Sequence, residues 1–299
     1  MNMVKCAAAA MLALVLGTQA PAAQPAREVT IGLGSRSLAG GSLRIAKELG
    51  LFDKHGLNAG FVFTDNPTIA ISGLLSRSYK FVVTGFPDFL TARAQGQEVV
   101  VVASTYEGLG INVVLDKALA AKTGVARDAP IEQRLKAMDG MLVAATGASS
   151  TTKISLDAAA KAAGVNIRFT YMTYQAMLSA LDAGAIQGFV AAAPFWAQSV
   201  TGGKGFEWIS VKDDLQPRFV PTMSSALGTR ADVIAGEPDL VRRMAAVVAD
   251  IGVAVRERPA DVKAAMARLY EGLSPETIEI LYRSEAQSWA TKPLTEARI

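Results

Sequence analysis

The sequence has almost none of the residues on which most catalytic and metal sites depend. Cys6 is the only cysteine and His55 the only histidine in 299 residues. One thiol cannot form an internal disulfide, and a single histidine without further cysteines excludes the usual zinc sites. His55 lies in the polar turn of residues 52–56, where a surface side chain is expected rather than a catalytic base. We therefore expect no metal, no cofactor and no catalytic residue.

A strong net charge is also missing. The formal net charge is +3, and the sequence has no cluster of basic residues and no mixture of basic with aromatic residues. Because proteins that bind nucleic acid usually carry such a cluster, a nucleic acid is not an expected partner.

Long apolar runs are absent beyond the N-terminus, and no later run reaches the ~20 residues that span a bilayer. At the N-terminus, Lys5 precedes a nearly continuous apolar run over residues 6–16, and small residues follow. This order is typical of a secretory signal peptide, here with cleavage within residues 20–23. We expect residues 1–23 to be removed, Cys6 with them, and the mature protein to be a soluble protein of the periplasm.

The rest of the sequence alternates between short apolar segments and helical patterns. The apolar segments, which we predict to be strands, cover residues 29–34, 58–64, 80–85, 98–104, 111–115, 141–146, 167–171, 186–191 and 207–211. Strands that alternate with helices at this spacing predict parallel sheets covered on both faces, an α/β architecture. The alternation changes near residues 105–112 and 222–229, which we interpret as two crossings between lobes. Three helices are predicted after the second crossing.

A glycine and a run of hydroxyl residues separate the predicted strand 141–146 from the next helix. The run consists of Ser149, Ser150, Thr151 and Thr152. The first amides of a helix have no internal partners and lie at the positive end of its dipole, so this loop could hold the oxygens of an anion. An ordinary Ser/Thr cap explains the same pattern. A position after a parallel strand favours a binding site.

Four segments carry a resemblance to a known family: residues 45–57, 84–87, 147–152 and 193–195. They resemble the substrate-binding proteins of ABC importers, in the group of nitrate, taurine and aliphatic-sulfonate receptors. The resemblance implies a two-lobed periplasmic-binding-protein fold (type II), each lobe a mostly parallel sheet flanked by helices, with two hinge crossings. The lobes would comprise residues 29–108 with 222–299 (lobe 1) and 109–221 (lobe 2). The ligand would bind in the cleft between them, and hinge closure would follow.

The resemblance also implies a ligand site at the loops that border this cleft. The candidate residues are Ser35, Arg36, Gly85, Phe86, Tyr106, Ser149, Ser150, Thr151, Thr152 and Phe195. Arg36 could hold a carboxylate or sulfonate against the helix start, or could be an exposed loop arginine. Phe86 and Phe195 could bracket an apolar ligand body or belong to the core. Tyr106, Tyr174 and Trp196 are weaker candidates for the same role.

Several residues bear on the charge of the ligand. Asp65 and Asp88 would repel an anion, so we expect them to face solvent or to cap helices. This sequence departs from the family pattern at Lys153, which stands beside the hydroxyl run. It departs again at Phe86, which replaces a serine or threonine that would bind a small oxyanion. The second departure disfavours nitrate and favours a larger organic anion.

Together these features predict a monomeric periplasmic receptor that captures a small organic anion, a sulfonate or carboxylate, and delivers it to an ABC permease. A receptor for a thiamine-precursor pyrimidine or another neutral heterocycle is an alternative, and it would require a buried carboxylate against ring nitrogens. A ligand-sensing module for a membrane signalling protein is a further alternative. An enzyme on this fold would require a set of histidines and cysteines for iron, which a mature chain with one histidine and no cysteine cannot supply.

Overall fold

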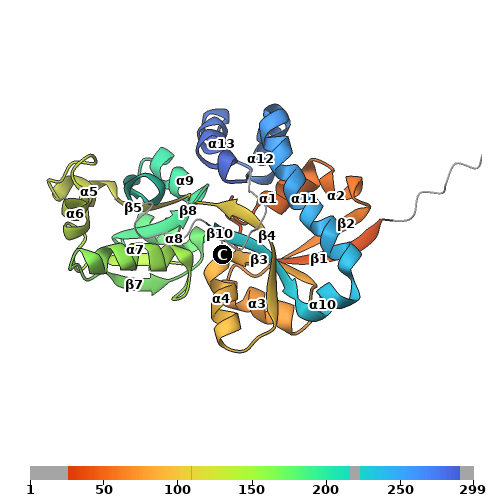
Figure 1. Ribbon diagram of the computed structural model, residues 1–299. Coiled ribbons are helices and arrows are strands. Elements are labelled where there is room, and N and C mark those ends of the chain that lie inside the picture. The colour runs from red at the N-terminus through yellow and green to blue at the C-terminus, as the bar shows by residue number, and fades with distance from the viewer. Residues whose placement is uncertain (1–25, 109, 216–222, 290–299) are drawn as a thin grey trace, which may run out of the picture.

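Two five-stranded sheets, each flanked by helices, form the two lobes of the molecule (Figure 1). The computed structural model describes residues 26–108, 110–215 and 223–289. The predicted signal peptide (1–23), the lobe boundaries at 109 and 221–222, and residues 290–299 of the predicted lobe 1 lie outside the described residues.

The sheet of the first lobe has the strand order β2-β1-β3-β10-β4. Its strands are β1 (Arg27–Leu33), β2 (Leu57–Phe63), β3 (Phe81–Gly85), β4 (Val99–Glu107) and β10 (Met223–Arg230). Strand β1 pairs in parallel with β2 and β3, whereas β10 runs antiparallel to both β3 and β4. The helices of this lobe are α1 (Ser42–Glu48), α2 (Leu51–Lys54), α3 (Pro67–Leu75), α4 (Phe86–Ala94) and α10 (Ala231–Gly236).

The sheet of the second lobe repeats this plan with the order β7-β6-β8-β5-β9. Its strands are β5 (Ile111–Asp116), β6 (Leu142–Ala145), β7 (Arg168–Tyr171), β8 (Gly188–Ala192) and β9 (Gly205–Ser210). Here β5 is the antiparallel strand, paired with β8 and β9. The helices are α5 (Lys117–Lys122), α6 (Ile131–Lys136), α7 (Thr151–Ala162), α8 (Tyr174–Asp182) and α9 (Phe195–Thr201), followed by a short π-helix, η1 (Val211–Leu215).

The predicted α/β architecture is confirmed, and each sheet is mostly parallel with one antiparallel strand. That strand comes directly after a crossing in both lobes, because a chain entering from the other lobe runs against the local strands. The segment 222–229, predicted to be only a crossing, is for the most part strand β10, in the middle of the first sheet. Its small residues fit that place: a side chain at Gly228 would collide with the ring of Phe89, 2.2 Å from the added Cβ.

Polar caps at the carboxyl ends of the strands begin several helices. Asn66 accepts a hydrogen bond from Ile69 N at the start of α3, and Ser150 accepts one from Lys153 N at the start of α7. At the start of α8, Thr173 accepts one from Ala176 N. These caps satisfy orphan amides of the first turn. Because strand ends and helix starts alternate along one edge of each sheet, Ser150 and Thr173 of the second lobe and Pro67, beside Asn66 of the first lobe, border the space between the lobes.

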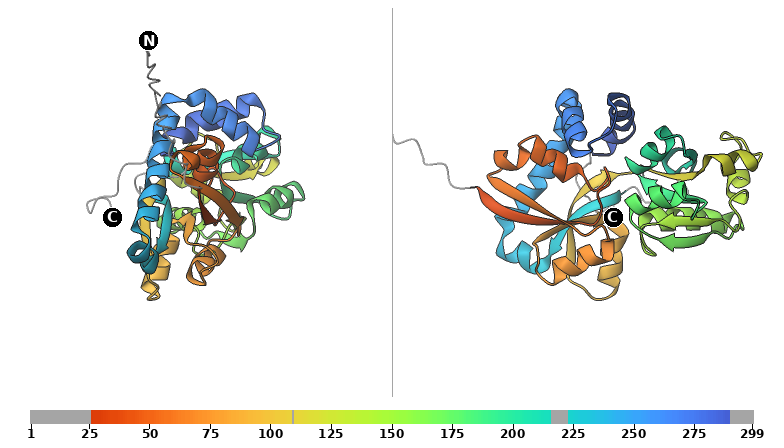
Figure 2. Two further views of the ribbon diagram at one scale, coloured as in Figure 1. Left: turned by 90° about the vertical axis from the view of Figure 1, so that its right-hand side faces the viewer. Right: turned by 180° about the vertical axis from the view of Figure 1, so that it is seen from behind.

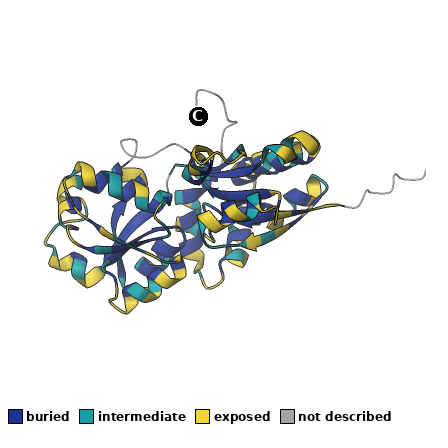
Figure 3. Ribbon diagram, turned by 90° about the horizontal axis from the view of Figure 1, so that it is seen from below, coloured by how far each residue is buried: buried dark blue, intermediate teal, exposed yellow. Residues whose placement is uncertain are grey.

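The last three helices, α11 (Pro238–Glu257), α12 (Pro259–Leu269) and α13 (Pro275–Trp289), return to the first lobe (Figures 1 and 2). Helix α11 packs on α1 and β4, and α13 packs on α11 and β4 but also contacts α9 of the second lobe. Buried side chains lie along the sheets at the centre of each lobe, with exposed residues on the outer faces of the helices (Figure 3). Within the described ranges, no helix is both long and apolar enough to cross a membrane.

The central place of β10 gives a stability prediction. Leu227 is 0% exposed, so Leu227→Ala should lower the free energy of unfolding by about 2–5 kcal/mol through lost burial and a residual cavity. Chemical denaturation measures this loss. The control Ile280→Ala removes a side chain of α13 that is 45% exposed and should change the free energy by less than about 0.5 kcal/mol. Equal effects in the two variants would contradict the central position of β10.

Candidate functional site

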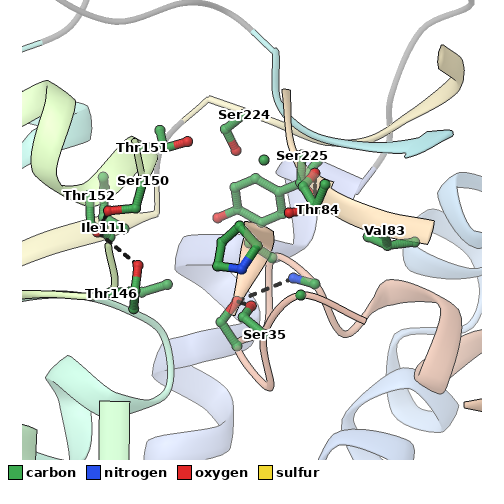
Figure 4. Close-up of a pocket in the computed structure, with 18 of the residues that line it drawn as sticks. Ser35, Val83, Thr84, Ile111, Thr146, Ser150, Thr151, Thr152, Ser224 and Ser225 are labelled. Carbon is green, nitrogen blue, oxygen red and sulfur yellow. Dashed lines mark hydrogen bonds between the residues drawn. The ribbon is translucent and has the colours of Figure 1, made fainter. Parts of the chain in front are cut away.

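A cavity of about 80 Å³ lies where the two sheets face each other. The loop after β1, the junction of β3 and α4, the ends of β4 and β10, and the β6–α7 loop all reach it. In Figure 4, Thr146, Ser150, Thr151 and Thr152 lie on one side, and Thr84, Ser224 and Ser225 lie on the other. The site is therefore built from both lobes.

Of the 21 described residues that line this cavity, eleven carry a hydroxyl group. They are Ser35, Ser37, Thr84, Tyr106, Thr146, Ser150, Thr151, Thr152, Tyr174, Ser224 and Ser225. Among the described residues that line the cavity, Asp88 is the only one with a charged side chain. Elsewhere too, the described part of the chain brings together no three His, Cys, Asp or Glu side chains that could hold a metal ion.

The start of α7 both caps the helix and lines the cavity. Ser150 Oγ donates to Gly147 O at 2.7 Å and lies 2.9 Å from Thr152 Oγ1, which in turn lies 3.3 Å from Thr146 Oγ1. The two interpretations of the hydroxyl run are thus compatible. Ser149 does not line the cavity, and Lys153 pairs with Asp157 along the helix.

The lobes approach each other closely at Gly85, the residue before α4. A Cβ added to Gly85 would lie 2.8 Å from Asp88 Oδ2 and 3.1 Å from Thr151 Oγ1 of the other lobe. A second contact joins the lobes nearby, where Leu38 N donates to Ala193 O at 2.7 Å. Because residue 85 is a glycine, no side chain stands between Asp88 and the start of α7, and both can face the same cavity.

Asp88 lies inside this site, although we expected it to face solvent or to cap a helix. Its carboxylate accepts from Thr84 Oγ1 at 2.8 Å, and the Gly85 backbone at the start of α4 also binds it, so the expected capping role is present. The side chain is nevertheless only 7% exposed and lines the cavity. Burial raises the pKa of Asp88 to about 6, against the opposing effect of the two hydrogen bonds.

Sequence reasoning missed the hydroxyls of β10. Ser225 Oγ donates to Thr84 O at 3.1 Å, and Thr105 Oγ1 donates to Ser225 Oγ at 3.2 Å. Ser224 lies beside them in the lining. The sequence did contain a signal for these hydroxyls, the pair Ser224 and Ser225 near the start of the segment 222–229. It was overlooked because that segment was interpreted as a crossing.

Arg36 borders a second cavity of about 310 Å³ rather than the first. Its Nε donates to Asp65 Oδ2 at 2.9 Å, and its guanidinium carbon lies 4.1 Å from the centre of the Phe63 ring. The side chain is 52% exposed. The guanidinium is therefore held at the rim, already paired with a carboxylate.

The two cavities are adjacent, because both are lined by Ser35, Thr146 and Tyr174. The Tyr174 ring stacks on Phe195 with centres 4.8 Å apart and planes at 22°, and both rings line the second cavity.

The other predicted aromatic residues have different surroundings. Tyr106 lines the first cavity, whereas Phe86 packs against a small core cluster of the first lobe and lines neither cavity. Trp196 is buried and also lines neither.

The sequence matches the model of the NMT1-like family over residues 22–270. The chain belongs to the NMT1-like family. The comparison with curated proteins gave no match.

Solved structures with the same fold include two sulfonate-binding proteins and a nitrate-binding protein. The alkanesulfonate-binding protein SsuA from Xanthomonas axonopodis pv. citri, bound to MOPS, has 17% identity and a TM-score of 0.72, covering 93% of this chain and 90% of that one. The aliphatic sulphonate-binding protein SsuA from Escherichia coli has 17% identity and a TM-score of 0.68, with 91% and 87% covered. The nitrate-binding protein NrtA from Synechocystis PCC 6803 has 16% identity and a TM-score of 0.66, with 84% and 68% covered.

These likenesses concern the fold. Together with the family match, they confirm the resemblance to substrate-binding proteins of the nitrate and sulfonate group and the predicted periplasmic-binding-protein fold of this NMT1-like protein.

The raised pKa of Asp88 predicts a pH-dependent stability. An aspartate ionises near pH 3.9 in an unfolded chain, whereas Asp88 ionises at about 6 in the fold. The stabilising contribution of Asp88 to folding is fully present below the pKa of an unfolded aspartate, and it is lost as pH rises through the folded-state pKa of about 6. The melting temperature of Asp88→Asn should therefore rise relative to that of the native protein between pH 4 and 7.

Thermal unfolding at a series of pH values measures this difference. Asp128→Asn, at an exposed aspartate of the second lobe, is the control and should follow the native profile. Parallel profiles for Asp88→Asn and the native protein would contradict the buried, ionisable state of Asp88.

Proposed function

We propose that this protein is the periplasmic receptor of an ABC importer, a monomer exported by the signal peptide 1–23. It captures a small polar molecule between lobe 1 (29–108 and 222–299) and lobe 2 (109–221), and it delivers that molecule to a membrane permease after hinge closure. The family match supports this role, as does a cavity lined by both lobes. A ligand that touches both lobes stabilises the closed form by its differential affinity for that form.

Asp88 is the observation that supports one ligand class most strongly. It is the only charged side chain of the first cavity among the described residues, and it is an acid. The surrounding hydroxyls accept as well as donate hydrogen bonds. A small ligand with N–H donors, such as a pyrimidine or another nitrogen heterocycle, complements this set, because its donors can meet the Asp88 carboxylate. A net anion brought next to the ionised acid meets repulsion.

An organic anion, either a sulfonate or a carboxylate, is the second candidate. The α7 start supports it, since Ser150, Thr151 and Thr152 line the cavity at the positive end of a 12-residue helix. Arg36 supports it from the neighbouring cavity, where a longer ligand would reach. In this arrangement the acid group would compete with Asp65 for the guanidinium.

A thermal-shift screen tests the proposed role. The protein is first freed of co-purified ligand by unfolding and refolding, and is then mixed with pyrimidines, other nitrogen heterocycles, sulfonates, carboxylates or nitrate. A ligand at a hundred times its dissociation constant adds about 2.7 kcal/mol of stability, which a melting curve resolves. Stabilisation by a heterocycle supports the first candidate and stabilisation by an organic anion the second. No shift with any of these compounds would contradict both.

Two single variants separate the ligand classes once a stabilising compound is known. Asp88→Asn should weaken an N–H donor ligand by about 1.5–3 kcal/mol, the contribution of a hydrogen bond to a charged group. Arg36→Ala should weaken an anion by a similar amount while leaving a neutral heterocycle unaffected. Titration calorimetry measures both effects. The control Arg77→Ala removes another exposed arginine of the first lobe; an equal loss in Arg77→Ala and Arg36→Ala would rule out a specific contact by Arg36.

A further inference from the structure

Helix α13 contacts segments of both lobes at their junction. Trp289 Nε1 donates to Leu38 O at 3.2 Å, and Leu38 N donates in turn to Ala193 O of the second lobe at 2.7 Å. Lys212 of η1, also in the second lobe, donates to Ser284 O of α13 at 3.4 Å. Movement of one lobe against the other must therefore change the surroundings of α13.

A buried acid lies on α13 at this junction. Glu285 is 3% exposed. Tyr106 Oη at the end of β4 donates to its Oε2, and Ser284 Oγ donates to its Oε1 at 3.2 Å. Gly110, where the chain crosses from β4 to β5, lies against both groups: a Cβ there would be 2.1 Å from Tyr106 Oη, and it would also collide with the Glu285 carboxylate. The acid, the tyrosine and the crossing thus form one packed cluster.

Among the described residues, little positive charge balances this acid: the titratable or charged groups that act on Glu285 are Tyr106 of β4 and Lys212 of η1. On α11, which also packs on α13, the charged side chains are exposed or paired elsewhere, Arg243 with Asp239 and Asp250 with Lys54. Helix α9, packed on α13, carries no charged residue, and Lys263 of α12 pairs with Glu279 instead. Burial consequently raises the pKa of Glu285 to about 7, and burial together with the neighbouring Glu285 raises the pKa of Tyr106 well above its usual value.

Tyr106 and Gly110 connect this cluster to the ligand site, because both line the first cavity. We propose that Glu285 is a positioning residue for ligand capture: through Tyr106 and Gly110 it links the closure of the lobes to the uptake of one proton. The proposal rests on the hinge closure of the proposed function and is independent of the ligand class.

The direction of the coupling follows from burial. In the arrangement described here, Tyr106 and Gly110 of the crossing pack on Glu285 and α9 packs on α13, and the resulting burial of the carboxyl disfavours its ionised form. Separation of the lobes withdraws α9 from α13 and admits water, which favours ionisation. The loss of the Lys212 charge acts in the opposite direction, but burial is the larger effect on the pKa of Glu285. The closed form should therefore predominate at low pH. The ratio of closed to open form should fall by up to about tenfold per pH unit as pH rises toward about 7, the pKa of Glu285 in the closed form. At higher pH the ratio should change little.

Spin labels on the two lobes test this coupling without a ligand. Cys6 is the only cysteine, so in a Cys6→Ser background labels can be placed at Gln97→Cys of the first lobe and Ala162→Cys of the second, both exposed positions. The distances between them are measured by pulsed electron resonance from pH 5.5 to 8.5. In the protein with the native junction, the distribution of distances between the two labels should shift toward longer values as pH rises. Asp88 also titrates, with a pKa of about 6, in the cavity between the lobes, so the native junction and its Glu285→Gln variant are compared in an Asp88→Asn background. There Glu285→Gln, which keeps the shape but cannot ionise, should show one distribution at every pH.

Two further variants make the test specific. Glu279→Gln changes a more exposed acid of the same helix and should retain the native pH profile. Tyr106→Phe removes the hydroxyl bound to Glu285 and should alter the profile, whereas a merely structural role would lower only the melting temperature. Distances in the native junction that do not change with pH would overturn the proposal, as would an unchanged profile in Glu285→Gln. Neither result would affect the receptor function, which the ligand screen tests.

Discussion

The close approach of the two lobes around Gly85 is the constraint on which the site depends. At this point the start of α4 from one sheet and the start of α7 from the other are separated only by the space that a side chain at position 85 would fill. Polar groups brought so close must be satisfied, because an unpaired buried donor or acceptor is costly. Hydroxyl side chains meet this requirement, since each can donate to one neighbour and accept from another.

Among the residues that the structure describes, the hydroxyl network leaves the charge of the cavity to Asp88. Asp88 takes part in the network through Thr84 and caps α4 through Gly85, so the same contacts that fix the helix start also fix the acid in the lining. Arg36 lies outside, paired with Asp65 above the Phe63 ring. Because charge inside a small enclosed space acts at a lower dielectric than charge at the rim, Asp88 should have more influence on ligand selection than Arg36.

The C-terminal helices connect this site to the rest of the first lobe. Tyr270 Oη donates to Ser37 O and Trp289 Nε1 donates to Leu38 O, so α12 and α13 hold the loop after β1 against the cavity. The same helix α13 carries Glu285 to Tyr106 at the crossing. The helices that close the fold thus also support two walls of the site.

Local patterns in the sequence were sufficient for nine of the ten described strands, for most helix starts and for the class of fold. The period of the apolar residues identified most elements, and the run from Ser149 to Thr152 indicated a cavity-lining helix start, because a cap and its helix are neighbours in the chain. The place of β10 and the orientation of Asp88 depended on contacts between distant segments. Glu285 meets Tyr106 across 179 positions of sequence, and no local pattern reports such a pair. The sequence by itself therefore determined the elements and the family, whereas only the tertiary structure decided which charge the cavity contains, since that depends on which side chains two folded lobes turn toward each other.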